Sequence, residues 1–210
     1  MPKKVDHQQR RDHLAKACHR VIMQRGFAAA TLREVAREAK MSSPLLVHYI
    51  KTREELLLHA HAYAAHILRN RFLRIEQDYK GLEAFRRILW GTIPHDKPST
   101  DNFKLWLGFW EMAERSPHVK AKLTSLYQET SDRFERILQQ AKELGEISND
   151  LDLAVTAWTA TTFVDGIGAQ VLATNQKFPK ERLKKYLNHW IEQNLRPKPG
   201  KKPKQIRRKK

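Results

Sequence analysis

Hydroxyl, imidazole and cationic side chains cluster between residues 31 and 53, at spacings that suit contacts with a nucleic acid. Small hydroxyls and the imidazole of His48 can bond to base edges or phosphates, while Leu45 and Val47 can rest on thymine methyl groups. Amides and cations at helix starts can hold phosphate oxygens. The residues that we expect to contact DNA are Thr31, Arg33, Ser42, Ser43, Pro44, Leu45, Val47, His48, Lys51 and Arg53.

Helix-capping residues divide this part of the chain into short helices. Apolar residues at intervals of three and four predict an amphipathic helix over residues 8–24, which Gly26 ends. Thr31, with Glu34 three residues later, predicts a capping box that opens a two-turn helix. Ser42 is a second N-cap, and Thr52 caps a fourth helix that continues to about residue 79.

The segment 31–50 therefore has the order helix, tight turn, helix. In this geometry the first helix braces across the DNA backbone while the second enters the major groove. Leu46, Tyr49 and Ile50 form the inner face of the second helix, so its outer face is left for the bases. A generic three-helix core with solvated polar residues is the alternative interpretation.

The rest of the chain has helical periodicity and no strand alternation, which predicts an all-α fold. We expect a short helix after Gly81 that reaches Trp90, a loop over residues 94–100, and helices over residues 102–114, 119–144, 151–174 and 180–194. The predicted organisation is a three-helix helix-turn-helix DNA-binding domain over residues 1–55, and a helical effector-binding and dimerisation domain over residues 56–195. Residues 196–210 are basic and proline-rich, so we expect a disordered tail.

The net charge of +17 is concentrated at the two ends of the chain. The first sixty residues carry 12 basic and 6 acidic side chains, and residues 196–210 carry nine basic and no acidic ones. Neutralising phosphates releases counterions and adds affinity that does not depend on base sequence. We therefore expect a polyanionic partner, with nucleic acid favoured over a membrane surface. The tail is either an accessory DNA-binding segment or a solvated extension.

The sequence favours a cytoplasmic protein without a membrane partner. No window approaches eighteen uninterrupted apolar residues, and the charged N-terminus has no apolar stretch behind it. The single cysteine, Cys18, cannot form an internal disulfide and falls on the apolar side of the first predicted helix. We interpret it as a core residue rather than a reactive thiol.

Aromatic residues in the C-terminal part suggest a ligand pocket. Aromatic faces attract quaternary ammonium groups, and a nearby carboxylate such as Glu111, Glu114 or Asp165 can complement the charge. The candidate effector-binding residues are Trp90, Phe103, Trp106, Phe109, Trp110, Glu111, Trp158 and Asp165. For each aromatic residue, packing in a core is the alternative.

Small residues in the helix over 151–174 allow another helix to approach closely. They are Ala154, Ala157, Ala160, Gly166, Gly168 and Ala169. Together with the last helix, over residues 180–194, they predict a four-helix homodimer interface, unless both helices pack inside one subunit. A homodimer suits the DNA contacts expected above, because two recognition helices must lie roughly 34–36 Å apart to enter successive major grooves.

No catalytic or metal-binding constellation is evident. His59, His61 and His66 invite a metal-site interpretation, but His59 and His61 point to different sides of a helix. We therefore favour surface or hinge positions for these histidines. The sequence contains no glycine-rich phosphate loop, CxxC pair or HExxH motif. We expect no enzyme activity, no metal and no cofactor. The alternative function is that of a non-specific nucleic-acid-binding or chromatin-organising helical protein.

The N-terminal motifs resemble the TetR family of bacterial repressors. The resemblance lies in Gly26-Phe27, residues 31–39 and residues 42–57 (SSPLLVHYIKTREELL). It implies a homodimeric repressor that a small-molecule effector releases from a double-stranded DNA operator. The positions that it matches to DNA contacts are Thr31, Ser43, Leu45, His48 and Arg53. The chain departs from the family pattern where Lys40 replaces a turn glycine, Val47 a phosphate-contacting tyrosine and Ile50 a phenylalanine.

Two C-terminal segments resemble a narrower group. Residues 103–117 (FKLWLGFWEMAERSP) and 162–172 (TFVDGIGAQVL) are similar to the C-terminal domain of the choline-responsive repressors that govern glycine betaine synthesis. That group also lacks the tyrosine at the position of Val47. The resemblance implies choline or another cationic amine as the effector.

Overall fold

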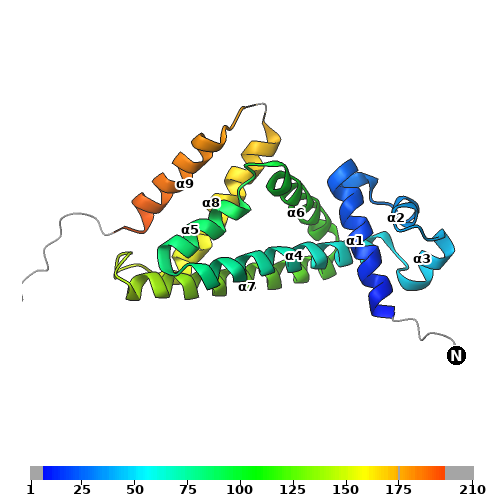
Figure 1. The fold of residues 1–210 in the computed structure, drawn as a ribbon, viewed down its shortest axis with the longest axis horizontal. Helices are drawn as coiled ribbons and strands as arrows, with labels where there is room; N and C mark the ends of the chain where they lie inside the picture. The colour runs from blue at the N-terminus through cyan, green and yellow to red at the C-terminus, as the bar shows by residue number, and fades with distance from the viewer. Residues whose placement is uncertain (1–6, 175, 197–210) are drawn as a thin grey trace, which may run out of the picture.

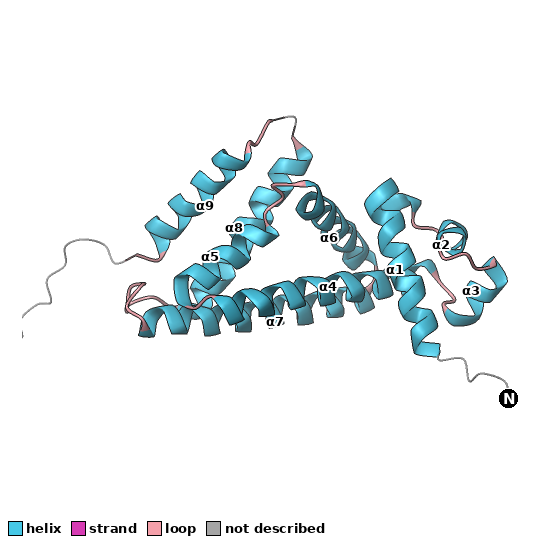
Figure 2. Ribbon diagram, viewed as in Figure 1, coloured by secondary structure: helices cyan, strands magenta, loops and turns pink. Residues whose placement is uncertain are grey.

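The computed structural model describes residues 7–174 and 176–196, and all secondary structure in these ranges is helical (Figure 1, Figure 2). In chain order the elements are α1 (His7–Arg25), the 3₁₀ helix η1 (Phe27–Ala29), α2 (Leu32–Glu38), α3 (Ser43–Tyr49), α4 (Arg53–Asp78), α5 (Gly81–Thr92), α6 (Lys97–Arg115), α7 (Pro117–Glu143), α8 (Leu153–Ala173) and α9 (Lys180–Asn194). The predicted all-α class is confirmed. Apart from Arg196, the predicted tail over residues 196–210 lies outside the described residues.

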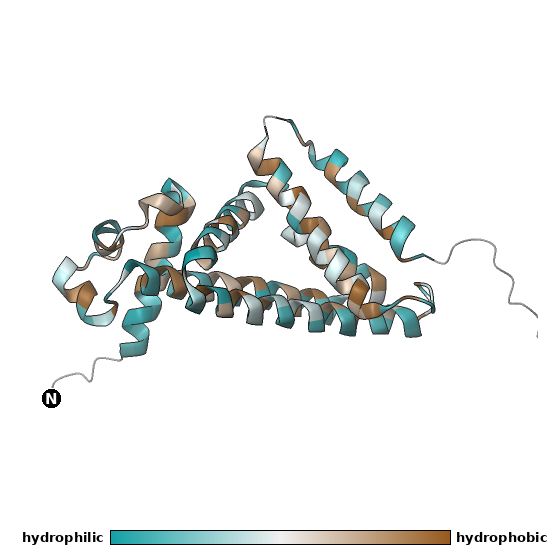
Figure 3. Ribbon diagram, turned by 180° about the vertical axis from the view of Figure 1, so that it is seen from behind, coloured by the Kyte–Doolittle hydropathy of each residue, from teal (hydrophilic) through white to brown (hydrophobic). Residues whose placement is uncertain are grey.

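The helices form a small group at one end of the molecule and a larger group beside it. Figure 1 shows α1, α2 and α3 together at one end, with α4 leading from them into a triangular arrangement of α5 to α8 and with α9 outside it. Seen from behind, α9 is mostly hydrophilic with a few hydrophobic residues between (Figure 3). No helix in the described ranges combines the length and the apolar character needed to cross a lipid bilayer.

Two hydrophobic cores hold these groups together. The first core joins α1, α2, α3 and the beginning of α4 to Leu105 and Phe109 of α6 and to Val119 and Leu123 of α7. The second core joins the later part of α4, through Phe72, to α5, α7, α8 and α9. The first core therefore extends beyond the predicted boundary at residues 55 and 56, and α4 crosses that boundary without a break. Cys18 is fully buried in the first core, and burial raises the pKa of its thiol to about 12.

The N-caps predicted for the first part of the chain are present. The hydroxyl oxygens of Thr31, Ser42 and Thr52 accept hydrogen bonds from the backbone N–H groups three residues later. The capping box predicted at Thr31 is only half formed, because the Glu34 carboxylate pairs with Arg25 and Arg37. The Thr31 N–H instead donates to the carbonyl of Ala29 at 2.8 Å.

The loop predicted over residues 94–100 is wrong in its second half, because α6 begins at Lys97. Asp96 and Ser99 form a reciprocal capping box, in which Asp96 Oδ1 accepts from the Ser99 N–H at 2.9 Å and Ser99 Oγ accepts from the Asp96 N–H at 3.1 Å. Pro98 lies in the first turn, where its missing N–H leaves no helical hydrogen bond unmade. The sequence prediction placed both Pro94 and Pro98 in a loop and did not include the N-cap at Asp96 between them.

Candidate nucleic-acid interface and ligand cavity

The turn between α2 and α3 is closed by a Schellman motif with lysine in the left-handed position. Lys40 has a φ of 54°, its N–H donates to the Arg37 carbonyl, and the Met41 N–H donates to the Ala36 carbonyl at 2.9 Å. The left-handed conformation crowds a Cβ atom, which is why glycine is usual there. The turn is formed in spite of this strain, and it places Ser42 as the N-cap of α3.

The outer face of α3 is open to solvent while its inner face is buried. Leu46, Tyr49 and Ile50 lie in the first core. On the outer face, Leu45 and Val47 are each 43% exposed, and Ser43, Pro44 and His48 are also exposed. These side chains are therefore accessible to a partner molecule. The arrangement is that of a helix available to a groove.

The remaining predicted contact residues surround α3. Thr31, Arg33, Ser42, Lys51 and Arg53 are all exposed. The Arg53 guanidinium donates to the carbonyls of Ala30 at 2.9 Å and Phe27 at 3.0 Å. Arg53 therefore also holds the segment that precedes α2, a role that its position in the sequence did not reveal. Its contact with phosphate stays a prediction, as do those of the other residues in this set.

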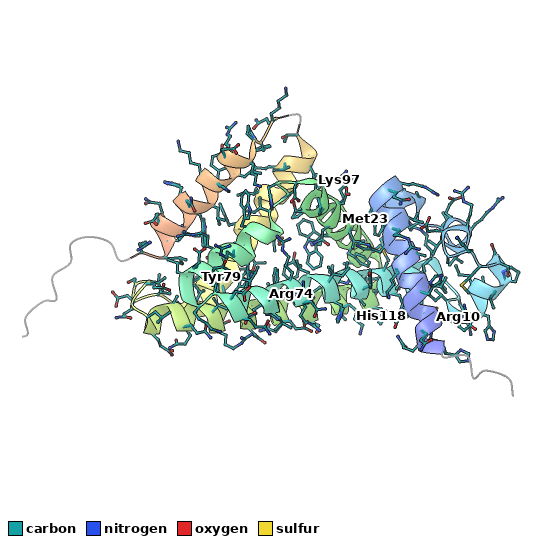
Figure 4. All side chains as sticks on the ribbon, viewed as in Figure 1. Arg10, Met23, Arg74, Tyr79, Lys97 and His118 are labelled. Atoms are coloured by element: carbon teal, nitrogen blue, oxygen red, sulfur yellow. The ribbon has the colours of Figure 1, made fainter. Side chains whose placement is uncertain are left out.

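A cavity of about 130 Å³ lies among α4, α6, α7 and α8. Figure 4 shows side chains from these helices projecting into the space that they enclose. An apolar cavity of roughly 150 Å³ in another protein holds benzene, so this one suits a ligand with a similarly small number of non-hydrogen atoms. Its lining includes the aromatic residues His61, Phe72, Phe103, Trp106, Tyr127 and Phe134 and the carboxylates Glu129 and Asp165.

The structure brings only part of the predicted effector-binding set to this cavity. Phe103, Trp106 and Asp165 line it. Trp110 lies behind the lining and donates its indole N–H to the Tyr127 hydroxyl at 3.0 Å. Phe109 is buried in the first core. The three that lie away from the cavity are Trp90, which stacks on His95, Glu111, which is exposed, and Trp158, which is 66% exposed.

Asp165 is the unpaired charge of the cavity. Its Oδ2 accepts a hydrogen bond from the Tyr127 hydroxyl at 2.9 Å, and among the described residues it has no basic partner within ion-pair distance. Burial raises the pKa of Asp165 to about 6 and, with help from Asp165, raises the pKa of Tyr127. The basic lining residues Arg69 and Arg133 are paired with Glu129 and Glu76.

His61 lines the cavity, so the surface or hinge position favoured for it from the sequence is wrong. Its side chain stacks on Trp106, contacts Phe109 and is 7% exposed, and its Nε2 has no hydrogen-bond partner within residues 7–174 and 176–196. Burial lowers the pKa of His61 to about 4, so the ring is neutral near pH 7. Its spacing of four residues after Leu57 and three before Ala64 places it on the apolar face of α4, which is the signal that could have located it. The described residues contain no group of three or more His, Cys, Asp or Glu side chains that could hold a metal ion.

The small residues of α8 divide between its two sides. Ala157, Ala160 and Gly168 are buried inside the subunit, where a Cβ at Gly168 would come within 2.1 Å of the Phe103 ring. The other side of α8 is exposed and includes Ala154, Gly166, Val155 at 58% and Trp158 at 66% exposure. An apolar strip of this kind is a candidate interface with another chain.

Comparisons with known proteins agree with this geometry. A family model for bacterial regulatory proteins of the tetR family matches residues 14–60, and one for the C-terminal domain of BetI-type transcriptional repressors matches residues 82–196. The HTH-type transcriptional regulator PksA of Bacillus subtilis is 26% identical over 193 residues, which are 91% of this chain and 93% of PksA.

Two further similarities are to a BetI regulator and to a solved structure. The HTH-type transcriptional regulator BetI of Stenotrophomonas maltophilia is 26% identical over 144 residues, which are 66% of this chain and 74% of that protein. The crystal structure of a transcriptional regulator from Saccharomonospora viridis in complex with choline superposes with a TM-score of 0.81 at 19% identity, covering 91% of this chain and all of that one. At that identity the superposition shows a shared fold.

Proposed function

This chain belongs to the TetR family of bacterial transcriptional regulators and has a C-terminal domain of the BetI type. From this premise we propose that it is a homodimeric repressor that binds a duplex DNA operator. The observation that carries the proposal is the exposed outer face of α3. Leu45 and Val47 lie in solvent there, while the opposite face of the same helix is fixed in the first core. Such a helix can enter a major groove without rearranging the fold.

Selection from a pool of random duplexes tests sequence-specific binding. We expect the full chain to enrich one sequence with two half-sites about one helical turn apart, and to keep binding it at physiological salt in excess random DNA. Equal affinity for random duplex would contradict the proposal and favour the alternative of non-specific nucleic-acid binding.

His48 offers a sharper test of the α3 face. We expect His48→Ala to weaken binding of the selected duplex at least fivefold, because a base-edge or phosphate contact is lost. The matched control is His118→Ala, since His118 is an exposed histidine near the start of α7 and away from α3 (Figure 4). Equal losses in the two variants would contradict the assignment of the α3 face.

The cavity supports a small organic cation as the effector. Asp165 provides a carboxylate without a cationic partner, and the rings of Phe103, Trp106 and Tyr127 provide faces that attract a quaternary ammonium group. The solved relative of the same fold that contains choline supports the same class of ligand. We propose that choline or a similar amine binds here and releases the dimer from its operator.

Calorimetry with choline and with 3,3-dimethylbutan-1-ol, in which a neutral carbon replaces the quaternary nitrogen, tests this class of ligand. We expect choline to bind the full chain and the isostere to bind at least tenfold more weakly, because only choline carries a charge for Asp165. Asp165→Asn is expected to remove most of this preference. Equal affinity for the two compounds, or no binding of either, would contradict a cationic effector.

A further inference from the structure

Phe27 occupies a notch in α6 that exists only because residue 108 is glycine. A Cβ atom on Gly108 would lie 2.4 Å from Cδ2 of the Phe27 ring, well inside contact distance. The same ring meets Phe109 edge to face, with the centroids 5.7 Å apart. Phe27 belongs to η1, so this contact joins the DNA-binding helices to the helix that also borders the cavity.

A continuous series of rings leads from Phe27 to the cavity. Phe109 contacts His61 at a centroid distance of 4.2 Å, and His61 stacks on Trp106 at 5.4 Å. Trp106 in turn meets Tyr127 edge to face at 5.7 Å. Of these residues, His61, Trp106 and Tyr127 line the cavity. We call Phe27, Phe109, His61, Trp106 and Tyr127 the ring series.

The far end of the ring series is bonded to the start of α2. The Phe27 carbonyl accepts hydrogen bonds from the Ala30 N–H and from Arg53, which also bonds the Ala30 carbonyl. Thr31, the N-cap of α2, follows directly. A displacement of the Phe27 backbone would therefore move α2, which packs against α3 in the first core.

Ring packing holds His61 in the middle of the ring series. Its Nε2 has no hydrogen-bond partner among the described residues, while the ring contacts Trp106 and Phe109. Closely packed interiors transmit displacement, and a ligand that fills the cavity removes the free volume into which His61 and Trp106 could otherwise move. A shift of Trp106 in the cavity is consequently passed to His61, then to Phe109 and Phe27.

We propose that the ring series couples the cavity to the α2–α3 unit, and that Gly108 is required because it lets Phe27 engage α6. The proposal rests on the proposed function, because it takes the cavity as the effector site. It adds the route by which ligand binding reaches the DNA-binding helices and names the residues that compose it.

Two glycine-to-alanine variants test the coupling. Gly108→Ala would push Phe27 out of its notch, whereas Gly91→Ala in α5 is the matched control, since a Cβ there meets only the Arg71 guanidinium at the ordinary contact distance of 3.4 Å. Each variant of the full chain is measured for choline affinity without DNA, and for affinity toward the selected duplex with and without saturating choline.

We expect choline to weaken duplex binding at least tenfold in the unaltered chain and in Gly91→Ala, and less than threefold in Gly108→Ala. The choline Kd without DNA should stay within twofold in all three proteins, because Gly108 does not line the cavity. A full choline effect in Gly108→Ala would overturn the proposal. An effect lost together with choline affinity would also overturn it, since Gly108 would then act on binding and not on coupling.

A measurement without ligand separates this inference from the proposed function. Trp106→Ala and Trp90→Ala each remove a half-buried tryptophan that stacks on a histidine, but only Trp106 belongs to the ring series. Hydrogen exchange reports local opening at individual amides. We expect the amides of residues 29–31 to exchange at least fivefold faster in Trp106→Ala and at an unchanged rate in Trp90→Ala, whose ring instead packs near Lys184 of α9.

Equal exchange at residues 29–31 in the two tryptophan variants would overturn the coupling whatever the ligand is. If choline neither binds the unaltered chain nor affects its duplex affinity, the cationic effector of the proposed function fails. In that case the exchange measurement still decides the ring series by itself.

Discussion

Lys40 shows how one residue can depart from a favoured type and leave the motif intact. Its backbone lies in the left-handed region at the end of α2, in a Schellman motif that α7 repeats with Gly145, whose φ is 70°. The hydrogen bonds of the motif are made in both places. The difference lies in the steric strain of a Cβ atom, which only Lys40 carries.

We predict that Lys40→Gly raises the free energy of unfolding by about 1 kcal/mol, because it relieves this strain. The reverse change, Gly145→Lys, should lower it by a similar amount, since a Cβ at Gly145 meets no atom within 4 Å and strain is the main effect. Urea unfolding at a fixed protein concentration measures both. A destabilised Lys40→Gly protein would refute the strain argument.

We expect Asp165 to make the proposed binding of a cation depend on pH. Its pKa is raised to about 6 by burial, so the carboxylate is ionised above that pH and protonated below it. A cation prefers the ionised form, so its affinity is full above pH 7 and is lost as the pH falls through 6. We predict that the choline Kd rises at least fivefold between pH 7.5 and pH 5, as measured by calorimetry.

Asp165→Asn provides the control for this pH dependence. The amide does not titrate, so the choline Kd of that variant should be weak and nearly constant over the same range. A pH dependence that persists in Asp165→Asn would assign the titration to another group.

At the scale of elements, the start of α6 shows that a cap outweighs the loop-forming tendency of nearby prolines. Asp96 and Ser99 satisfy the first N–H groups of the helix reciprocally, and Pro98 sits where no N–H is needed. The hydrogen bonds from Ser99 to the Asp96 carboxylate hold the pKa of that carboxyl below its usual value. This cap sets the first turn of α6, from which Phe103 and Trp106 reach the cavity.

We predict that Asp96→Ala lowers the free energy of unfolding by about 1 kcal/mol, the usual effect of losing an N-cap side chain. The matched control is Asp150→Ala, which removes an exposed aspartate outside the helices and should change stability little. Thermal or urea unfolding compares the two. Equal effects would show that the capping box contributes nothing beyond the loss of one surface charge.

At the scale of the whole molecule, the exposed side of α8 is the surface through which we propose that two copies of the chain associate. Trp158 and Val155 lie in solvent on that side, and large aromatic residues often carry much of the binding energy of an interface. The prediction of a homodimer through α8 and α9 is based on this surface. In such a dimer Trp158, which lies outside the cavity, would be buried against the partner chain.

We predict that Trp158→Lys converts the dimer largely to monomer at micromolar concentration and weakens binding of the selected duplex at least tenfold. Leu144→Lys is the matched control, because Leu144 is also exposed, at 60%, but lies at the end of α7. Sedimentation measures the oligomeric state of both. A Trp158→Lys protein that sediments like the unaltered chain would exclude this side of α8 as the interface.

Local information in the sequence determined most of the elements. Caps at Thr31, Ser42 and Thr52, together with apolar periodicity, predicted the all-α class and the succession of α1 to α4, because each helix start depends on residues within one turn. The same locality explains the outward side chains of α3: once Leu46 and Ile50 are buried, Val47 and His48 must lie on the other face.

The cavity was decided by tertiary structure. Periodicity shows that a helix has an apolar face but not which neighbour it meets, so Phe103 and Trp158 seemed equivalent candidates although one is buried and the other exposed. His61 and Tyr127 gained their roles only when α4, α6, α7 and α8 converged. Residues far apart in sequence share a site through packing between helices, and no pattern within a single helix encodes that packing.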